Sequence, residues 1–428
     1  MSTPQWITNP TQEDQIHTVV NAFIAEYGYE PAGVWAAPGR VNLLGEHVDY
    51  AGGTVMPLAL PHRTLVAASP RQDGMLRAVS DQADGVEQIA LKDIAPGALS
   101  GWFTYVAGVP WGMKKVADID VVGADLAITS AVPVGGGLSS SAALECSVAL
   151  ALDELTAQRQ ETVPLHQTDE GRATLAQICI AAENDIAGAQ TGGMDQSISL
   201  RALEGSVLTI DCRDFSTKPL TVDVASAGLA LLVIDTKAPH QLADGQYARR
   251  RAICELAAEA FNVDNVRNAM PTHMSYADAE AVVQRWEESL NDVELPEDTT
   301  PEQAIARIRH VVHEMVRVQE CIDIYSASVT DESWKRLGEL LSCSHASLRD
   351  DYEVTVLQLD VAVEAAEHAG ALGARMVGGG FGGSVLALVP QQKIEDIAEA
   401  VVNAFEQHGF GAPAFVEATP GAAAIRVK

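Results

Sequence analysis

The sequence predicts a mixed α and β protein with two lobes. Its 428 residues are more than a single hydrophobic core usually organises, which favours a division into two lobes. Residues 124–129 alternate apolar and polar side chains, as a half-buried strand does. Residues 142–155 are rich in Ala, Leu and Glu and contain no Gly or Pro, which favours a helix. Patterning alone therefore predicts both element types and two lobes, without a more specific fold.

Three further strand-like runs mark the expected boundary between the lobes. They span residues 206–210, 219–224 and 229–234. We place the boundary at their start, so that the expected N-terminal lobe is 1–205 and the expected C-terminal lobe is 206–428.

Composition and charge narrow the classes of partner. The chain is 47% hydrophobic and 20% charged, which is ordinary for a globular protein. A formal net charge of −30 argues against nucleic acid or an anionic membrane surface as a partner, because both are polyanions. No run approaches the ~20 apolar residues of a membrane-spanning helix, and the N-terminus lacks a secretory signal pattern. We therefore expect a cytoplasmic protein that binds small molecules, with no obligate protein partner.

The six cysteines agree with that compartment. They lie far apart and form no C-x-x-C pair, so neither a disulfide scaffold nor a zinc ribbon is expected. Cys343 and His345 are close enough to suggest a metal site, but no further ligand lies near them in the sequence. We expect a structural role for this pair and reduced thiols throughout.

Residues 133–147 form the first candidate site. They read Pro-Val-Gly-Gly-Gly-Leu-Ser-Ser-Ser-Ala-Ala-Leu-Glu-Cys-Ser and lie between the expected strand and the expected helix. The first N–H groups of a helix have no partner within it, and the helix dipole favours an anion there. Three residues without side chains let the main chain wrap closely around a phosphate. The hydroxyls of Ser139, Ser140 and Ser141 could cap the helix, bind phosphate oxygens or ligate Mg²⁺. A Ser-capped helix that binds nothing has the same pattern.

Two commoner phosphate-binding motifs are excluded. No Lys follows the glycines, so the stretch is not a P-loop. Residues 378–383 formally spell G-x-G-x-x-G, but the residues after them, 384–389, form a strand-like run. A dinucleotide fingerprint requires a helix at that position, so this match is accidental.

A second candidate site lies in residues 34–53. Six polar or charged residues fall within eleven positions there, among several glycines. Loops that bind small polar ligands look like this, because each hydroxyl of a sugar, for example, needs a donor or an acceptor at a fixed position. A turn whose side chains only face water is the alternative. The six residues are Arg40, Asn42, Glu46, His47, Asp49 and Tyr50.

These two stretches resemble motifs of one enzyme family. Residues 38–50, Pro-Gly-Arg-Val-Asn-Leu-Leu-Gly-Glu-His-Val-Asp-Tyr, resemble the galactokinase signature. Gly-Gly-Gly-Leu-Ser-Ser-Ser-Ala-Ala resembles the second motif of the superfamily named for galactokinase, homoserine, mevalonate and phosphomevalonate kinases. The Asp-Tyr pair at 49–50 favours galactokinase, since mevalonate kinases share Gly-Glu-His but lack that pair. Ala51 stands where the family usually has Asn, a departure that weakens no catalytic assignment.

Further segments continue the resemblance over residues 30–390, in the order of the family. Residues 192–196, Gly-Gly-Met-Asp-Gln, resemble the segment with the catalytic Asp, and Ala-Glu183 resembles the segment with a Mg²⁺-ligating Glu. The segment around Tyr247 also resembles the family, and Tyr247 stands at the position that contacts the sugar in that family. Residues 373–384 match the third, Gly-rich motif.

The resemblance implies an α+β fold, the two-lobed small-molecule-kinase fold, with the active site in the cleft between the lobes. It also implies an ATP-dependent sugar 1-kinase. Such an enzyme transfers the γ-phosphate of ATP to the C1 hydroxyl of D-galactose and gives galactose 1-phosphate, the first committed step of galactose use. The implied partners are ATP and galactose, and the implied cofactor is Mg²⁺.

The residue roles follow from the same resemblance. Asp195 would accept the proton of the sugar hydroxyl, and Arg40 would orient Asp195 and stabilise developing charge. Ser141 and Glu183 would hold Mg²⁺. The residues expected to bind the sugar are Glu46, His47, Asp49, Gly192 and Tyr247; those expected to bind ATP are Gly135, Gly136, Gly137, Leu138, Ser139, Ser140 and Ser141.

Two other functions remain alternatives at this point. One is a kinase of a related sugar such as N-acetylgalactosamine, whose pocket must admit a bulky group at C2. The other is a regulator that binds galactose and ATP but has lost turnover. Such relatives have a shortened Ser-Ala stretch after the glycines, whereas residues 139–143 are full length here and Asp195 is present.

Overall fold

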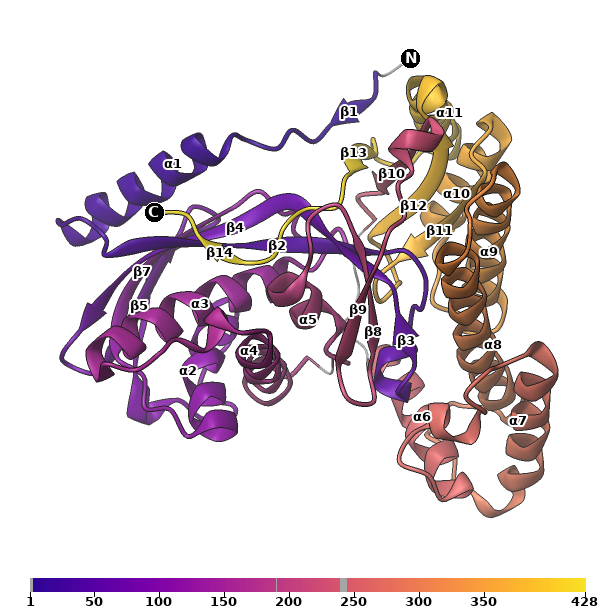
Figure 1. The fold of residues 1–428 in the computed structure, drawn as a ribbon, viewed down its shortest axis with the longest axis horizontal. Coiled ribbons are helices and arrows are strands. Elements are labelled where there is room, and N and C mark those ends of the chain that lie inside the picture. The colour runs from indigo at the N-terminus through magenta and orange to yellow at the C-terminus, as the bar shows by residue number, and fades with distance from the viewer. Residues whose placement is uncertain (1–2, 190, 239–244) are drawn as a thin grey trace.

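Three sheets and the helices packed on them make up the protein (Figure 1). The structure is a computed structural model, and it describes residues 3–189, 191–238 and 245–428. Among these residues the sheets have six, five and three strands.

The six-stranded sheet is built mainly from the first third of the chain, in the order β14-β2-β4-β7-β5-β6. Its strands pair antiparallel except for β5 and β7, which run parallel. The strand expected at 124–129 is confirmed within β7. The bounds are β2 (Gly33–Asn42), β4 (Pro57–Arg71), β5 (Met75–Ser80), β6 (Ala83–Ala90), β7 (Gly123–Ser130) and β14 (Ile425–Arg426).

Helices cover both faces of this sheet. Val34 and Ala36 of β2 pack on one face against α1, whereas Trp35 and Ala37 face the opposite cluster, to which α2, α3, α4 and α5 contribute. Successive strand side chains point to opposite faces, so one strand serves two hydrophobic cores. Figure 1 shows α1 on one side of these strands and α2, α3 and α4 on the other. The helices are α1 (Gln12–Tyr27), α2 (Phe103–Ala117), α3 (Ser140–Gln160), α4 (Asp169–Ala181) and α5 (Met194–Arg201).

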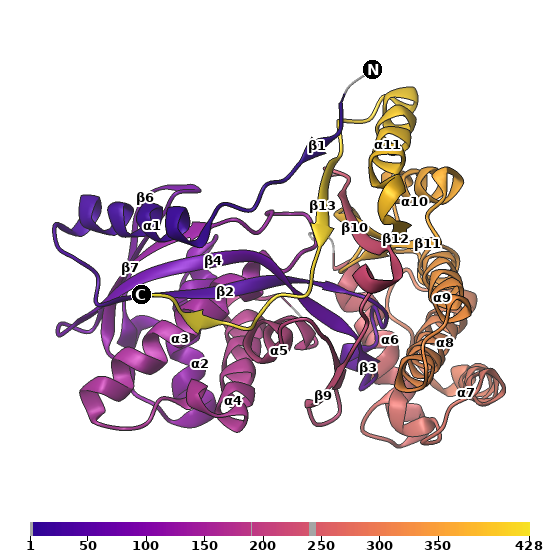
Figure 2. The same cartoon turned by 45° about the horizontal axis from the view of Figure 1, so that its top comes forward.

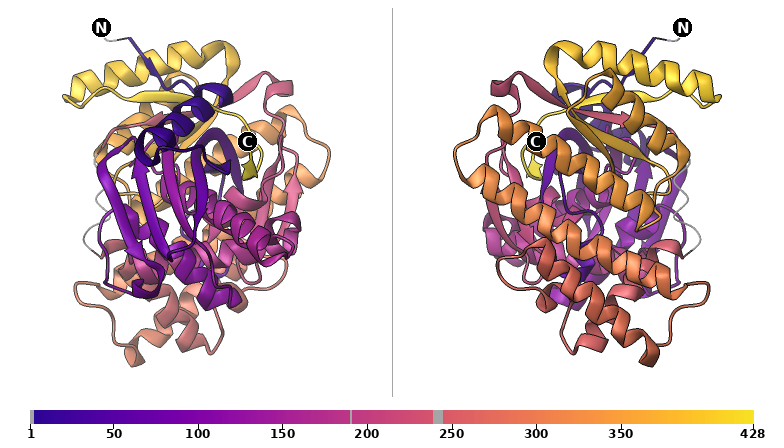
Figure 3. Two further views of the ribbon diagram at one scale, coloured as in Figure 1. Left: turned by 90° about the vertical axis from the view of Figure 1, so that its left-hand side faces the viewer. Right: turned by 90° about the vertical axis from the view of Figure 1, so that its right-hand side faces the viewer.

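The five-stranded sheet has the order β1-β13-β10-β12-β11. Leu232 and Ile234 of β10 pack in the core that includes α10 and α11, and the alternate residues Leu231 and Val233 pack toward α9. The orange helices α8 and α9 run across the outside of the molecule in the right-hand view of Figure 3. The bounds are β1 (Gln5–Trp6), β10 (Leu229–Asp235), β11 (Gly373–Val377), β12 (Ser384–Pro390), β13 (Ala414–Ala418), α6 (Gln246–Phe261), α7 (Tyr276–Ser289), α8 (Pro301–Ser326), α9 (Asp331–Asp350), α10 (Leu357–Ala369) and α11 (Ile394–His408).

A small third sheet joins β3 (Thr54–Val55) to the hairpin of β8 (Val207–Asp211) and β9 (Ser216–Leu220). The runs expected at 206–210 and 229–234 are confirmed by β8 and β10, but the run expected at 219–224 is displaced. A tight turn after β8 sets the register, because the N–H of Phe215 donates to Asp211 O at 2.7 Å.

The two large sheets share a hydrophobic core. Val41 and Leu43, near the end of β2, belong to the same buried cluster as Leu231 of β10 and Leu340 of α9. The chain ends also cross between the sheets: β1 pairs with β13, and β14 pairs with β2. Figure 2 shows the yellow run that leaves β13 and reaches β2. The division at residue 205 therefore remains a prediction, since the terminal strands lie in the sheets opposite to it.

The structure also describes the cysteines and the hydropathy of the helices. All six cysteines are free thiols, and five of them are buried. No helix in the described ranges is long and apolar enough to cross a membrane.

Candidate active site

Arg40 and Asp195 form the central ion pair of the candidate site. Arg40 lies on β2 at an irregularity in the pairing with β4, and it is 5% exposed. Its Nε donates to Asp195 Oδ1 at 2.9 Å and its Nη2 donates to Asp195 Oδ2 at 2.9 Å. Asp195 belongs to the first turn of α5, where the helix dipole stabilises a carboxylate. The two predicted catalytic residues therefore meet in a bidentate pair, which fixes the carboxylate in one orientation.

The strand that holds Arg40 lies directly against the Gly-rich loop. The N–H of Arg40 donates to Leu138 O at 3.0 Å, and its Nη1 donates to Gly137 O at 2.5 Å. A Cβ on Gly39 would lie 2.6 Å from Leu138 O, so only glycine permits this approach. The arginine thus links the Asp195 carboxylate, which is predicted to be catalytic, to the loop that is expected to bind phosphate.

The Gly-rich loop itself has left-handed main-chain geometry at three positions. Gly135, Gly137 and Ser139 have φ angles of 75°, 70° and 60°, and α3 begins at the next residue. The expected helix is confirmed, but the Ser139 side chain does not cap it and instead donates to Asp195 Oδ2. Leu138 is buried in the shared core, so only its main chain is available to a ligand.

The third Gly-rich motif closes behind this loop. Ser384 Oγ donates to Gly136 O at 2.5 Å. A Cβ on Gly378 would lie 3.0 Å from Gly137 O, and a Cβ on Gly137 would lie 3.1 Å from Val377 O. Two segments about 240 residues apart in the chain are therefore in main-chain contact. The loop packs against the end of β11 and the start of β12.

Two further carboxyl groups, those of Glu183 and Glu145, lie close to Asp195. Glu183 is buried on η4 (Ala182–Ala187), a π-helical turn that continues α4. Gln196 Nε2 donates to Glu183 Oε2 at 2.5 Å and to Glu145 Oε2 at 3.3 Å. Burial and then the charge of Asp195 raise the pKa of Glu183 to about 7. Burial and then the charge of Glu183 raise the pKa of Glu145 well above its usual value.

This arrangement fits a magnesium ion held jointly with a nucleotide. No group of three His, Cys, Asp or Glu side chains converges as a metal cage within the described ranges. Mg²⁺ commonly uses one or two protein carboxylates and takes its other oxygens from phosphates and water. Glu183 and the partly exposed Ser141 supply such oxygens, and an H-bond from Ser141 lowers the pKa of Glu183 against the effect of burial. The buried Glu145 Oε1 has no hydrogen-bond partner among the residues that the structure describes.

The expected sugar residues gather on a different wall, made of aromatic rings. His47 Nδ1 lies 2.9 Å from Tyr50 Oη, which lies 2.7 Å from Tyr352 Oη. The Tyr247 ring centroid is 5.4 Å from that of His47 and 5.4 Å from that of Tyr50. Burial holds the pKa of His47 well below its usual value, so this imidazole is neutral. His47 and Tyr50 come from the loop after β2, Tyr247 from the start of α6 and Tyr352 from just beyond the end of α9.

Asp49 begins η1 (Asp49–Ala51) beside these rings. A Cβ on Gly192 would lie 2.2 Å from Asp49 Oδ2, so the two predicted residues are in contact and the second must be glycine. Burial, followed by the charge of Asp195, raises the pKa of Asp49 to about 6. The Asp49 carboxylate therefore lies near the Asp195 carboxylate in a region that disfavours charge. Hydrogen bonds from hydroxyl donors would stabilise its charged form.

Glu46 lies nearby but is turned toward the protein. Its Oε1 accepts the N–H of Gly378 at 2.9 Å and pairs with Arg375 Nη2 at 3.2 Å. Arg375 also donates from Nε to Leu43 O at 2.9 Å. Through these contacts Glu46 connects the polar loop of residues 34–53 to the third Gly-rich motif. Its Oε1 is therefore already bonded within the protein.

Four residues of the site were not singled out from the sequence. Glu145 lies four residues after Ser141 on α3, so helical spacing alone places both on one face. Gln196 follows Asp195 directly, and Arg375 is the single charged residue of the buried strand β11. Tyr352 has no sequence signal of this kind. The first three could have been found from periodicity and from charge within an apolar run.

Family comparisons agree with this geometry. The family model described as "Galactokinase galactose-binding signature" matches residues 21–70. Those described as "GHMP kinases N terminal domain" and "GHMP kinases C terminal" match residues 105–202 and 325–407. The first match contains the polar loop of residues 34–53, the second contains the Gly-rich loop and Asp195, and the third contains the third Gly-rich motif.

Whole-chain relatives and solved structures extend the agreement. The galactokinase of Streptomyces coelicolor is 42% identical over 413 residues, which is 96% of this chain and 98% of that protein. That of Mycobacterium tuberculosis is 40% identical over 394 residues, 92% of this chain and 99% of that protein. The structure of Lactococcus lactis galactokinase complexed with galactose matches with a TM-score of 0.82 at 29% identity, covering 96% of this chain and 100% of that chain.

A more distant structure shows the wider fold. The mevalonate kinase of Methanococcus jannaschii matches with a TM-score of 0.57 at 15% identity, covering 91% of this chain and 98% of that chain. This likeness concerns the α+β fold alone. The matches over nearly the full length, together with the paired Arg40 and Asp195 beside the Gly-rich loop, lead to one conclusion: the chain belongs to the galactokinase family of the GHMP kinases.

Proposed function

We propose that this chain transfers the γ-phosphoryl group of ATP to the C1 hydroxyl of D-galactose, giving galactose 1-phosphate. The observation that carries the proposal is the bidentate pair of Arg40 and Asp195, which lies between the Gly-rich loop and the aromatic wall. A base at that position would touch the hydroxyl of a sugar on one side and face the terminal phosphate of ATP on the other.

Asp195 acts as the general base in this proposal. It accepts the proton of the C1 hydroxyl while the oxygen attacks phosphorus, and such help is typically worth ~10²–10⁴-fold in rate. Arg40 holds the carboxylate in one orientation, and its positive charge stabilises the charge that develops during transfer. Ser139 Oγ donates a hydrogen bond to the second carboxylate oxygen, Asp195 Oδ2.

The Gly-rich loop positions the phosphates. Phosphoryl transfer has a loose transition state that spreads charge over the equatorial oxygens, so placement and neutralisation provide most of the catalysis. Main-chain N–H groups of Gly135–Ser141, at the start of α3, would donate to the β- and γ-phosphates. Glu183 and Ser141 would hold Mg²⁺, which supplies positive charge and an anchor for the phosphate oxygens when bound.

Asp49 and the aromatic wall read the sugar. A carboxylate accepts hydrogen bonds from two neighbouring hydroxyls, which suits C3 and C4 of a pyranose. His47 is neutral and Tyr247 adds an apolar face with a polar end, so both suit an uncharged sugar. Galactose has its C4 hydroxyl axial, and glucose would leave the Asp49 carboxylate short of a donor.

The cellular setting follows from the substrates. ATP and free galactose are cytoplasmic metabolites, and the six free cysteines suit a reducing compartment. We therefore place the reaction in the cytoplasm, with these two substrates as its partners and Mg²⁺ as its cofactor.

One assay tests the proposal directly. ATP consumption is measured against galactose, glucose and N-acetylgalactosamine, and the product is identified by ³¹P NMR. We expect turnover with galactose and a product phosphorylated at C1. Preference for N-acetylgalactosamine would redirect the proposal to a kinase of that sugar, and binding of galactose and ATP without turnover would indicate a regulator.

A further inference from the structure

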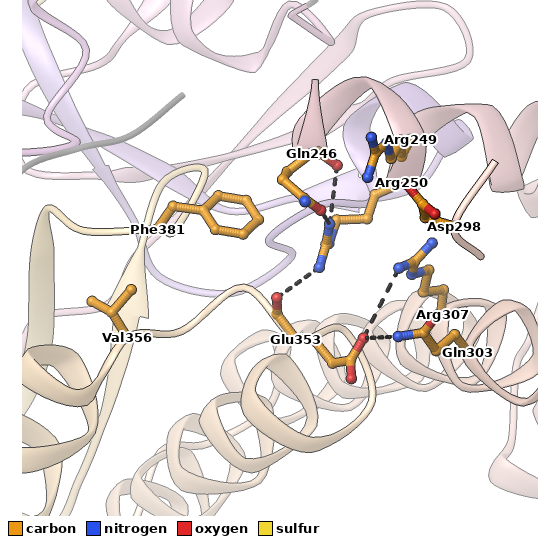
Figure 4. Close-up of a pocket in the computed structure, with 9 residues that line it drawn as sticks. All are labelled: Gln246, Arg249, Arg250, Asp298, Gln303, Arg307, Glu353, Val356 and Phe381. Atoms are coloured by element: carbon orange, nitrogen blue, oxygen red, sulfur yellow. Dashed lines mark hydrogen bonds and ion pairs between the residues drawn. The ribbon is translucent and has the colours of Figure 1, made fainter. Parts of the chain in front are cut away.

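A second cavity lies outside the site described so far, between the start of α6, the start of α8 and the loop after α9. Its volume is about 530 Å³, within the range of small-molecule sites. Figure 4 shows Arg249 and Arg250 entering it from α6, and Arg307 from α8. Phe381 and Val356 form an apolar wall on the other side.

The arginine charges in this cavity are poorly neutralised. Arg250 is 2% exposed, yet all of its hydrogen bonds go to uncharged oxygens. Its Nε donates to Tyr352 O at 2.9 Å and its Nη2 to Glu353 O at 2.6 Å. Its Nη1 donates to the Gln246 main-chain and side-chain oxygens at 3.1 and 2.7 Å. A buried cation without a carboxylate partner retains its attraction for an anion.

Arg307 is in a similar position. It is 3% exposed, and its nearest carboxylate oxygen, Glu353 Oε2, lies 3.9 Å from Nη2. That oxygen already accepts Gln303 Nε2 at 2.9 Å. The buried Arg307 Nε has no hydrogen-bond partner. Burial first, and then the positive charge of Arg307, lowers the pKa of Arg250 to about 10, so the two guanidinium groups repel each other.

Arg249 completes the group and is the accessible member. It is partly exposed, and its side chain makes no hydrogen bond or ion pair with any residue the structure describes. Three guanidinium groups thus border one cavity with Glu353 and Asp298 as the acidic lining residues. This excess of positive charge is found on a chain with a net charge of −30, where cations are scarce.

We propose that this cavity binds a small phosphorylated molecule, at a site separate from the Gly-rich loop. Guanidinium groups bind phosphate through paired, charge-assisted hydrogen bonds, and a phosphate dianion would offset the repulsion among the three arginines. The apolar wall of Phe381 and Val356 gives the rest of the molecule a surface to pack against. A bare polyanion would leave that wall exposed, so the shape favours a phosphate joined to an organic body.

The test uses the full-length protein with its active site filled. Protein saturated with galactose and a non-hydrolysable ATP analogue is titrated with glucose 6-phosphate by calorimetry, and uncharged glucose serves as the neutral comparison. We expect one saturable site for glucose 6-phosphate, competition by inorganic phosphate and no heat from glucose. Saturation by galactose and the analogue is established in separate titrations, so a failure of the proposed kinase function is seen independently.

Two variants locate the site. Arg249→Gln removes a side chain that has no partner among the described residues, so we expect the variant to fold and to bind glucose 6-phosphate about tenfold more weakly. Arg309→Gln is the matched control, because it removes the same charge from α8 outside the cavity. We expect its affinity to stay within about twofold of wild type. Absence of saturable binding at millimolar concentrations overturns the proposal. Equal losses in the two variants, or no loss in Arg249→Gln, also overturn it.

Discussion

The phosphate side and the sugar side of the candidate active site differ in how they are built. On the phosphate side, which comprises Gly135–Ser141 with Arg40, Asp195 and Glu183, Arg40 and Asp195 are in direct contact and Glu183 is held by Gln196. The sugar side, Asp49 with the rings of His47, Tyr50, Tyr247 and Tyr352, is largely neutral and contains one carboxylate. The phosphate side thus holds fixed charges, whereas the sugar side is an apolar surface with one carboxylate as a hydrogen-bond acceptor.

The difference teaches how rate and selectivity are divided. Charge that is fixed before the substrate arrives needs no reorganisation during the reaction, so the phosphate side should determine kcat. Uncharged rings exclude water and leave hydroxyl recognition to Asp49, so the sugar side should determine KM and the choice of sugar. Variants on the two sides should therefore change different kinetic constants.

Asp195→Ala should have the largest effect. Loss of the general base should lower kcat by ~10²-fold or more, whereas galactose and ATP should still bind nearly normally. Calorimetric titration and steady-state kinetics measure the two quantities separately. Retention of more than about a tenth of the wild-type kcat would remove Asp195 from the role of base.

Asp49→Asn should have the next largest effect, on the other side. The amide replaces one acceptor by a donor, and a buried group left unsatisfied costs about 1–3 kcal/mol. We expect KM for galactose to rise and the galactose-to-glucose ratio of kcat/KM to narrow, with KM for ATP almost unchanged. Gly192→Ala should act in the same direction, because its Cβ would press on the Asp49 carboxylate. An intact galactose preference in Asp49→Asn would show that C4 is read elsewhere.

The pH dependence of galactose binding follows from the same carboxylate. The folded-state pKa of Asp49 is raised to about 6, so the group gains its proton at a higher pH than an ordinary Asp. Protonation removes an acceptor, and KM for galactose should therefore rise as the pH falls through about 6. The Asn variant should lose this dependence. A profile that is unchanged in the variant would assign the titration to another group.

Glu183→Gln should have a smaller effect, on the metal requirement. The pKa of Glu183 is raised to about 7, so below that pH Mg²⁺ must displace a proton to bind. For wild type, the Mg²⁺ concentration at half-maximal rate should rise as the pH falls through 7. The Gln variant should need more Mg²⁺ at every pH and lose that trend. Asp185→Asn, on the same turn but paired with Lys115, is the control and should behave as wild type.

Glu145→Gln should have the smallest effect. The pKa of Glu145 is raised well above its usual value, so the folded protein holds this carboxyl protonated, and an amide imitates it. Such a group contributes stability at low pH that is lost as the pH rises toward the folded-state pKa. At pH 8 the melting temperature of Glu145→Gln should equal or exceed that of wild type, with kcat within about threefold. A large loss of kcat would mean that the ionised carboxylate takes part in catalysis.

Much of the fold and of the site could be predicted from the sequence, where the signal is local. The strand, Gly-rich turn and helix at 124–155 are confirmed, because apolar alternation and helix propensity act over neighbouring residues. The contact between Arg40 and Asp195 follows the family motifs, although the bidentate geometry comes from the structure. The strand expected at 219–224 is displaced because a turn at Asp211, outside the run itself, fixes the pairing.

Features that depend on distant contacts had no such signal. The tie between Glu46 and Arg375 joins positions over 300 residues apart, so no local pattern could show it. The same holds for Tyr352, which reaches the aromatic wall from the end of α9. Arg307 and Arg250 read as ordinary charged residues of two helices, and only packing shows that they border one cavity.

The exchange of terminal strands has a consequence for how the protein is made. The six-stranded sheet contains β14 at its edge, so this edge cannot be complete until residues 425–426 have left the ribosome. Synthesis at ~5–20 residues per second leaves the nascent N-terminal part without this strand for tens of seconds. During that time the edge of β2, with its run of buried residues Val34, Trp35 and Ala36, is open to pairing with other chains. Removal of β14 should accordingly lower the yield of folded protein during expression more than the activity of the molecules that fold.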